Sequence, residues 1–369
     1  MSTAGTPQSD ARTPSDIAAR LREAGFVRLV AAGTGDGVAA AGLLADALDR
    51  EAVAYQTSVV ALPGSTARAT GADLTVALGR PTPDADLTLG TEGDPASQTA
   101  VAVVRELRSG TVPAGAAVLG VAGALAAGRD PDEQVLAAAD LKRRPGLAVP
   151  VADPIEGLAH STLVHGPFSG SVSDTRERFA GLADERALAS AVALAVAGDE
   201  AGVARGGAAV ERLLRPRVGG PFETAGGYAD VLDALARERP GHAVAAALGA
   251  DLEVLPVWRD HAARAHTAVH EARTGRYDGL FVVRCNGPAP VGTVARLVRD
   301  YRSPEPVTLA VADGEAALCA VPDAPVDIGT TLETAAHAVD GEGGGTRTRG
   351  RARFDGESSA FVLEAREAL

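Results

Sequence analysis

Short apolar runs alternate with longer helical segments over the first 130 residues, and this alternation is the feature that most constrains the fold. The run Leu-Thr-Val-Ala-Leu-Gly at 74–79 shows no inside–outside alternation, so a strand made from it should be covered on both faces. Such strands occur in parallel sheets flanked by helices, and we therefore predict an α/β fold with a parallel N-terminal sheet. The expected strands are 26–32, 53–62, 74–78 and 85–89, and the expected helices are 38–49, 96–107 and 114–127.

The rest of the chain predicts a tail, a helical connector and a second domain. The N-terminus has the small, polar composition of a disordered tail, and Ser15 and Asp16 are candidates to cap the helix that follows it. The Pro- and Gly-rich stretch 215–227 is the best break point. The predicted parts are a tail at 1–13, a parallel-sheet domain at 14–200, a helical connector at 201–250 and a smaller α/β domain at 251–369.

Helical and apolar segments alternate again after residue 255, which is why the last part is predicted to be α/β. The glycine-rich segment near its end is expected to form a turn. The expected helices are 258–274, 293–301 and 331–339, and the expected strands are 279–285, 307–312 and 316–321.

Composition indicates where the protein works. The net charge is −13, and Lys142 is the single lysine among 35 basic residues, which indicates a high-salt cytoplasm, with GC-rich coding as the alternative explanation. Net acidity argues against nucleic-acid binding, but salt screens this repulsion, so local basic patches carry more information than the total. Cys285 and Cys319 form no paired motif, and no apolar run is long enough for a membrane span. We therefore expect a cytoplasmic protein that does not contact a membrane.

A glycine-rich turn follows the first predicted strand, with Gly33, Gly35 and Gly37 in alternate positions. One interpretation is a dinucleotide-binding turn, although the spacing differs from G-x-G-x-x-G and no acidic residue ends the second strand. Another is a tight strand-to-helix turn that needs glycine for steric reasons. Both stay open at this point.

The same turn also resembles a motif of the DHH-family phosphoesterases, which include the RecJ-like exonucleases. Thr34-Gly35-Asp36-Gly37 lies where that family has a D-x-D-G-type turn, and the helix rich in Ala and Leu that follows is similar to the family's. Later segments resemble the family's segments in the same order and spacing. These segments are 72–79, 85–95, 118–130, 157–170, 226–249 and 341–350.

The resemblance implies a cleft built for metal-assisted phosphodiester hydrolysis with manganese or magnesium, yet the ligands are missing. Asp36 is the one candidate catalytic carboxylate that is retained. The resemblance therefore implies a non-catalytic protein, without a cofactor, that binds single-stranded DNA or RNA, or replisome or repair proteins. The alternative is an active exonuclease or phosphoesterase with a displaced Mn or Mg site. The residues in the places of metal ligands are Thr34, Ala77, the segment Leu89–Thr91, Ala127 and Thr346.

An arginine stripe near the C-terminus is the most informative polar feature. Arginines alternate through Arg-Thr-Arg-Gly-Arg-Ala-Arg, so on a strand they would share one face. They follow a glycine triplet that resembles the phosphate-binding loop of the DHH-associated domain. We predict a nucleic-acid or phosphate site here, with a charge-protected edge strand as the alternative. The site residues are Gly343, Gly344, Gly345, Arg347, Arg349 and Arg351, and Arg353 continues the stripe.

Histidines form a weaker set of candidates. Three of them fall on one predicted helix, where two could share a face, but the zinc-protease pattern is absent, so helix histidines with a structural role are favoured over a metal site. A loop histidine flanked by serines lacks the G-x-S-x-G turn of hydrolases. The helix residues are His261, His266 and His270, and the loop residues are His160, Ser161, His165 and Ser169.

Overall fold

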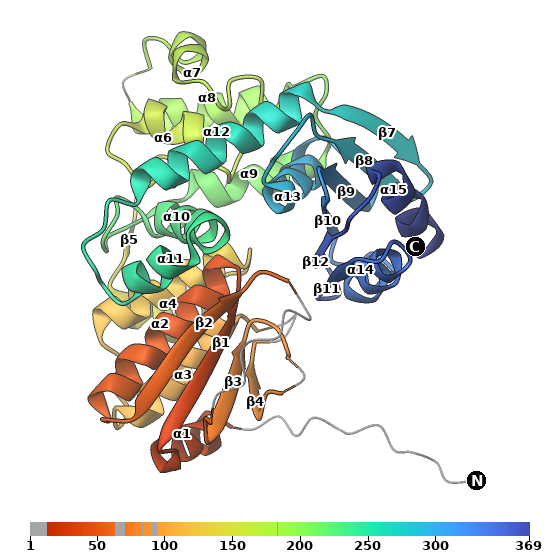
Figure 1. The fold of residues 1–369 in the computed structure, drawn as a ribbon. Coiled ribbons are helices and arrows are strands. Elements are labelled where there is room, and N and C mark those ends of the chain that lie inside the picture. The colour runs from red at the N-terminus through yellow and green to blue at the C-terminus, as the bar shows by residue number, and fades with distance from the viewer. Residues whose placement is uncertain (1–12, 63–70, 83, 91–93, 183) are drawn as a thin grey trace.

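The computed structural model describes residues 13–62, 71–82, 84–90, 94–182 and 184–369. The chain runs from an N-terminal sheet through a series of helices to a second sheet, and these three parts curve around a shared centre (Figure 1). The fold is α/β, as predicted, with a parallel sheet first and a separate sheet in the C-terminal part.

The N-terminal sheet has four parallel strands in the order β2-β1-β3-β4. Its central strand β1 is buried along almost its whole length, which explains the continuous apolar run in the sequence. Helix α1 begins two residues earlier than a cap at Ser15 would place it, because Thr13 caps it and forms a capping box with Asp16. The elements are α1 (Pro14–Glu23), β1 (Phe26–Ala32), α2 (Gly35–Arg50), β2 (Ala54–Val60), β3 (Leu74–Leu78), β4 (Leu87–Leu89), α3 (Ala96–Leu107), α4 (Ala114–Ala126) and α5 (Glu133–Ala139).

The middle part is helical, with one short two-stranded ribbon formed by β5 and β6. Helix α10 packs into the same apolar cluster as β1, α2 and α4, so it follows the 215–227 loop but belongs to the N-terminal core. The predicted domain boundaries stay a prediction. The elements are β5 (Lys142–Arg143), α6 (Pro154–His160), α7 (Val172–Arg178), α8 (Glu185–Ala197), α9 (Arg205–Leu214), β6 (Arg217–Val218), α10 (Ala225–Glu238), α11 (Pro240–Ala247) and α12 (Leu255–Glu271).

The C-terminal sheet has six strands in the order β11-β12-β10-β9-β8-β7. Helix α13 packs on one face, and α14 and α15 cover the other. The expected helix at 258–274 was too long at its end, because β7 starts at Arg273 and pairs with β8. The elements are β7 (Arg273–Tyr277), β8 (Leu280–Arg284), α13 (Val291–Tyr301), β9 (Val307–Ala312), β10 (Glu315–Ala320), α14 (Ile328–His337), β11 (Glu342–Gly345), β12 (Arg349–Arg353) and α15 (Ser358–Glu367).

The glycine triplet forms an edge strand, so the expected turn at this place was wrong. Gly343, Gly344 and Gly345 belong to β11 and pair with β12. A Cβ on Gly343 would lie 2.6 Å from the Leu332 carbonyl O on α14. Glycine is thus needed here because β11 lies directly against α14, which is a packing reason and gives no information about phosphate.

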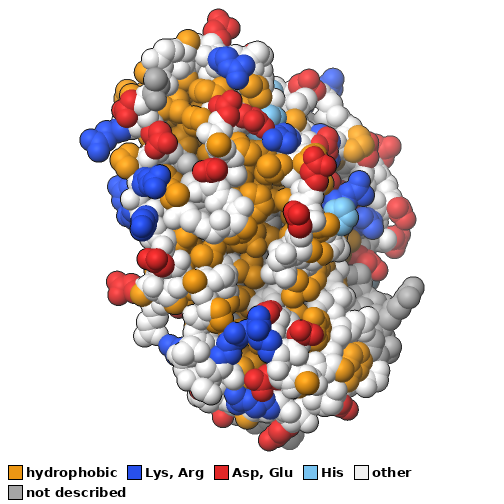
Figure 2. Space-filling view, turned by 90° about the vertical axis from the view of Figure 1, so that its left-hand side faces the viewer, with side chains coloured by type: hydrophobic (Ala, Val, Ile, Leu, Met, Phe, Trp, Pro, Cys, Tyr) orange, Lys and Arg blue, Asp and Glu red, His pale blue; other side chains and the backbone are white. Residues whose placement is uncertain are grey.

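One face of the molecule carries an extended band of hydrophobic side chains flanked by charged groups (Figure 2). Only 3% of the chain is aromatic, so the apolar surface and the core consist mainly of Ala, Val and Leu. Within the described ranges, no helix is long and apolar enough to cross a membrane.

Replacing Gly343 with alanine should destabilise the protein. The new methyl group must displace the backbone of α14, and overpacking of this kind costs about 1–3 kcal/mol. Chemical denaturation followed by circular dichroism would measure the loss. The control is Gly356→Ala, where a Cβ meets nothing within 4 Å and the change should stay within about 0.5 kcal/mol. Equal stabilities for the two variants would contradict the packing explanation.

Candidate functional site

The retained aspartate, Asp36, lies in the first turn of α2 and is buried. Its two carboxylate oxygens accept hydrogen bonds from the backbone N–H groups of Ala96 and Ser97, each at 2.9 Å. These are the first N–H groups of α3, which have no partner within the helix. Burial raises the pKa of Asp36, while these hydrogen bonds and the charge of Arg349 lower it in part. Asp36 therefore anchors a helix N-terminus.

The first turn of α2 is also closed by protein groups. The Thr34 hydroxyl accepts a hydrogen bond from the Gly37 N–H at 3.2 Å, and Asp233 Oδ1 accepts one from the Gly35 N–H at 3.1 Å. Asp233 also pairs with Arg237 at 2.9 Å. Burial alone would raise the pKa of Asp233, but these neighbours and Arg296 lower it to about 2. A charged carboxylate therefore occupies the place that a dinucleotide phosphate would need, so the dinucleotide interpretation is wrong.

The other positions that resemble lost ligands carry no carboxylate or imidazole for a metal. Ala77 and Leu89 are buried aliphatic residues on β3 and β4, and Ala127 is the C-cap residue of α4. Thr346 lies in the turn between β11 and β12, where its N–H donates to the Arg349 carbonyl O at 2.8 Å. Thr91 lies outside the described residues.

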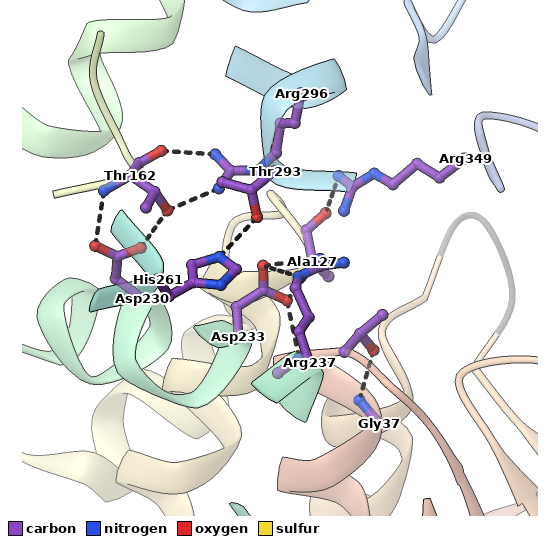
Figure 3. A network of polar contacts seen from close by, with 12 residues as sticks. Gly37, Ala127, Thr162, Asp230, Asp233, Arg237, His261, Thr293, Arg296 and Arg349 are labelled. Atoms are coloured by element: carbon purple, nitrogen blue, oxygen red, sulfur yellow. Dashed lines mark hydrogen bonds and ion pairs between the residues drawn. The ribbon is translucent and has the colours of Figure 1, made fainter. Parts of the chain in front are cut away.

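A cavity of about 140 Å³ lies at the centre of the molecule, between the N-terminal core, the helical part and the C-terminal sheet. We call it the arginine pocket, because guanidinium groups from three separate elements reach it: Arg212 from α9, Arg296 from α13 and Arg349 from β12. Carboxylates of α10 also line it (Figure 3). The other lining residues are Leu125, Ala126, Gly128, Arg129, Asp130, Leu163, Gly226, Ala229, Asp230 and Asp233.

Arg349 carries the least compensated charge in the arginine pocket. Its guanidinium donates to the Ala127 carbonyl O at 2.9 Å, and among the described residues this is its only side-chain hydrogen bond. Burial, and then repulsion from Arg299 and Arg296, lower the pKa of Arg349 to about 10. The carbonyl belongs to the C-terminal end of α4, whose dipole gives partial compensation. Arg349 thus stays charged at neutral pH without a carboxylate partner, which is costly even for a half-buried group.

The neighbouring guanidiniums are held in position by their own partners. Arg212 pairs with Asp300 at 2.6 Å, and Arg296 donates two hydrogen bonds to Thr162, each at 2.8 Å. A Cβ on Gly128 would lie 3.3 Å from an Arg349 nitrogen and 3.4 Å from an Arg212 nitrogen. The two guanidiniums therefore flank the same short stretch of backbone.

The carboxylate of Asp230, next to these guanidiniums, has hydrogen-bond partners on both oxygens. It accepts hydrogen bonds from the Thr162 N–H at 3.0 Å, from the Thr162 hydroxyl at 2.5 Å and from the Trp258 indole N–H at 3.0 Å. Burial raises the pKa of Asp230, and these bonds lower it in part. The bonds connect α10 and α12 to the loop that positions Arg296, so Asp230 supports the pocket from behind.

The arginine stripe is only partly as expected. Arg349, Arg351 and Arg353 are alternate residues of β12 and therefore lie on one face of the sheet, opposite Cys319, Ala317 and Glu315 of β10. Arg347 lies before the strand and donates to the Ala324 carbonyl O at 3.1 Å. Arg351 and Arg353 form ion pairs with Glu315, at 3.3 Å and 3.2 Å. Of the stripe, Arg349 alone lines the arginine pocket, and the next two arginines are partly neutralised.

The residues present do not fit a pair of divalent cations. Both oxygens of Asp36 are occupied by helix N–H groups, and a guanidinium lies close enough to influence its pKa. Hard cations need several free carboxylate oxygens, and a nearby positive charge repels them. Over the described part of the chain, no group of three His, Cys, Asp or Glu residues could hold a metal ion.

The histidine candidates have structural positions. His261 is buried and connects Glu238, at 2.7 Å, to the Thr293 hydroxyl, at 2.9 Å. His266 contacts the Ser161 carbonyl O and the ring of His165, each at 3.1 Å. The remaining candidates also bond to backbone: His270 contacts the Ser169 carbonyl O, and His160 contacts the Glu156 carbonyl O.

The predicted thiols and the serines of the histidine loop show no catalytic arrangement. Cys285 and Cys319 are free, and burial raises the pKa of Cys285 to about 11. The Ser161 and Ser169 hydroxyls accept hydrogen bonds from nearby backbone N–H groups, namely those of Leu163 and Gly166.

Comparison with known sequences gives a clear relationship. The protein described as "Uncharacterized protein rrnAC1427", from Haloarcula marismortui, is 49% identical over 384 residues, which cover 100% of both chains. The chain belongs to the rrnAC1427 family. The family model for the C-terminal domain of rrnAC1427 matches residues 272–367, which span all six strands of the second sheet.

Comparison with solved structures places the fold. CDC45 from Entamoeba histolytica matches this rrnAC1427-family protein with a TM-score of 0.55 and 9% identity, over 96% of this chain and 98% of that one. Exonuclease RecJ bound to manganese matches with a TM-score of 0.48 and 15% identity, over 97% and 93%. RecJ from Thermus thermophilus matches with a TM-score of 0.49 and 15% identity, and this chain covers 56% of it. The match with CDC45, over almost the full length of both chains, confirms the predicted fold.

Sequence inspection missed most of the arginine pocket. Arg212 and Arg296 lie on ordinary amphipathic helices, and nothing in their local sequence distinguishes them from surface arginines. Asp230 and Asp233 gave a faint signal, because two acidic residues on the apolar face of one helix must have buried partners. Their partners come from distant segments, so the signal could not identify them.

We expect Asp36→Ala to destabilise the protein by about 1–3 kcal/mol, because two N–H groups of α3 lose their acceptor in a buried position. Asp49→Ala, at the exposed end of the same helix, should change stability by less than about 0.5 kcal/mol. Melting temperatures measured with and without manganese distinguish a role of Asp36 in anchoring α3 from a role in binding a metal. A wild-type protein that manganese stabilises, and an Asp36→Ala variant that it does not, would contradict the anchoring role.

Stability should also fall on mild acidification. Burial, together with His270, His160 and Arg296, lowers the pKa of His266 to about 3, and burial and nearby cations lower the pKa of His165 well below 6.5. Neutral histidines therefore favour the folded state fully above about pH 6.5, and this contribution is lost as the pH falls towards 3. Melting temperatures between pH 7 and 5 should decline, with a smaller decline in His165→Phe. The control is His337→Gln at an exposed site, which should leave the decline in melting temperature unchanged. If His165→Phe also leaves it unchanged, the buried histidines are not the cause of the loss of stability in acid.

Proposed function

We propose that this rrnAC1427-family protein is a non-catalytic binder of single-stranded nucleic acid that holds a backbone phosphate in the arginine pocket. The observation that carries the proposal is Arg349, a half-buried guanidinium that lines the cavity without a carboxylate partner. Guanidiniums form two parallel hydrogen bonds with a phosphate, which would supply the missing compensation.

The size and position of the arginine pocket support a single phosphate group as the part of the ligand that enters. A cavity of about 140 Å³ accommodates a small oxyanion but not a stack of bases. Arg212 and Arg296 reach the cavity from other elements, so a phosphate there would contact the helical part and both domains. The nucleic acid would then leave the pocket along β11 and β12, past Gly343–Gly345, Arg347 and Arg351.

The proposal assigns no hydrolysis to this cleft. Phosphodiester hydrolysis in this fold would need metal-bound oxygens, and the carboxylates of Asp36 and Asp233 are occupied by N–H groups and by Arg237. An active exonuclease or phosphoesterase with a displaced Mn or Mg site is the alternative. The resemblance in sequence further implies replisome or repair proteins as partners. We include these partners and a cytoplasmic location in the proposal.

Arg349→Ala should weaken the binding of single-stranded DNA about tenfold in low salt and reduce the slope of log affinity against log salt by about 0.7. Fluorescence anisotropy over a KCl series measures both quantities. The matched control is Arg353→Ala on the same face of the same strand, where the side chain is 65% exposed and already paired with Glu315. Equal affinities for the wild type and for Arg349→Ala would disprove a phosphate site in the pocket.

Incubation of labelled single-stranded DNA or RNA with the protein and Mn²⁺ or Mg²⁺ should leave the strand intact. Degradation by the wild type that disappears in Asp36→Ala, in a variant shown to be folded, would establish the enzymatic alternative instead. Degradation that persists in Asp36→Ala would indicate a contaminating nuclease.

A further inference from the structure

A short antiparallel ribbon near the arginine pocket concentrates positive charge. In this ribbon Lys142 pairs with Val218, and Arg143 pairs with Arg217, and the Arg144 N–H extends the ladder by donating to the Pro216 carbonyl O at 3.3 Å. Most of the side chains are exposed. We call the following five residues the basic ribbon: Lys142, Arg143, Arg144, Arg215 and Arg217.

The charges of the basic ribbon are not neutralised locally. Within the described residues, none of its five side chains forms an ion pair or a side-chain hydrogen bond. Single exposed arginines elsewhere, such as Arg178, are also unpaired, so the distinguishing feature of the ribbon is that five such cations lie together. This cluster occurs in a chain whose net charge is −13. Such a local excess of cations in an acidic protein is the pattern expected of a surface for a polyanion.

The ribbon also contains a repulsive pair. Arg143 and Arg217 lie directly opposite each other, and like charges in that position destabilise a ladder. Burial, and then the charge of Arg143, lower the pKa of Arg217, which Asp130 offsets only in part. An anion bound by the guanidinium groups of Arg143 and Arg217 would relieve this repulsion. The arrangement therefore favours a ligand-binding role over a purely structural one.

The basic ribbon continues the row of cations that begins in the arginine pocket. Arg212, which lines the pocket, lies three residues before Arg215, and β6 follows directly. On the other side, Arg129 and Asp130 line the pocket, and the charge of Asp130 acts on Arg217. The positive surface therefore extends from the central cavity to the outside of the helical part, where β5 lies (Figure 1).

We propose that the basic ribbon is a second contact surface, on which a single strand of DNA or RNA continues after one of its phosphates has entered the arginine pocket. This inference rests on the proposed function. A phosphodiester backbone carries one negative charge per nucleotide and would neutralise the ribbon along its length, whatever the base sequence. An acidic protein segment would match the charge as well, but not the continuity with a pocket of phosphate size.

The test compares strands of two lengths. A variant carrying Lys142→Ala, Arg143→Ala and Arg144→Ala should bind a ~20-nucleotide strand at least about tenfold more weakly in low salt, and its salt slope should fall by about 2. Its affinity for a ~4-nucleotide strand, which reaches little beyond the pocket, should change less than about twofold. The charge-matched control replaces three exposed arginines of α7 and β7, which lie away from β5 in Figure 1, with Ala: Arg178, Arg273 and Arg276.

A second variant separates loss of binding from loss of structure. Arg143→Glu converts the repulsive pair with Arg217 into an opposite-charge pair, so it should raise the melting temperature of the free protein while it weakens binding of the long strand. A misfolded variant would instead show a lower melting temperature together with weaker binding to strands of both lengths.

The outcomes distinguish this inference from the proposed function. If the wild type binds neither strand, the proposed function itself fails. If Arg349→Ala weakens binding but the triple ribbon variant does not, the pocket stands and the ribbon surface is disproved. Retained long-strand affinity in the triple variant, together with lost binding of a poly-glutamate peptide, would assign the ribbon to an acidic protein and also overturn the inference.

Discussion

The charge of Arg349 determines what the centre of this molecule can hold. It projects from the C-terminal sheet to the end of α4, within electrostatic range of Asp36, and thus occupies the space between the two domains with a fixed cation. A divalent metal and a guanidinium cannot share such a space, because each would raise the energy of the other at low dielectric. An oxyanion can share it. The poor fit of this space to a divalent metal and the phosphate binding that we propose therefore rest on the same charge, to which Arg212 and Arg296 add.

The aspartates near this centre have structural partners that explain why they persist in the fold. Asp36 closes the N-terminus of α3, and Asp233 closes the N-terminus of α2. Each thus satisfies donors that a helix leaves free at its start and adds a favourable interaction with the helix dipole. A carboxylate bound in this way has little capacity left for a metal. Asp36 matches the family motif in sequence, yet in the structure it caps the N-terminus of α3. A motif match without the partner ligands is therefore weak evidence for catalysis.

The fold was largely predictable from the sequence, and the pocket was not. Apolar periodicity, which is a local property, predicted the buried strand Phe26–Ala32 and three strands of the second sheet, β8, β9 and β10. The edge strand at Gly343–Gly345 was missed, because its glycines are required by contact with α14, and no local pattern records that contact. The predicted arginine stripe includes Arg349, which lines the arginine pocket, and its binding role stays a prediction. Arg212 and Arg296 could not be found in the same way, since their roles depend on where three distant elements meet.

The acidity of the whole chain makes the cationic centre more selective. A net charge of −13 repels polyanions from most of the surface, so a nucleic acid can approach closely only where cations gather. Long-range repulsion is screened within about 10 Å at 0.1 M salt and within a shorter distance at higher salt, whereas contacts in a partly enclosed cavity are screened less. High salt would therefore remove the general repulsion first and leave the contacts in the arginine pocket as the main source of affinity. An acidic protein with an enclosed cationic pocket is thus suited to bind phosphate where exposed lysine-rich surfaces would lose their attraction, and the near absence of lysine from this chain agrees with that constraint.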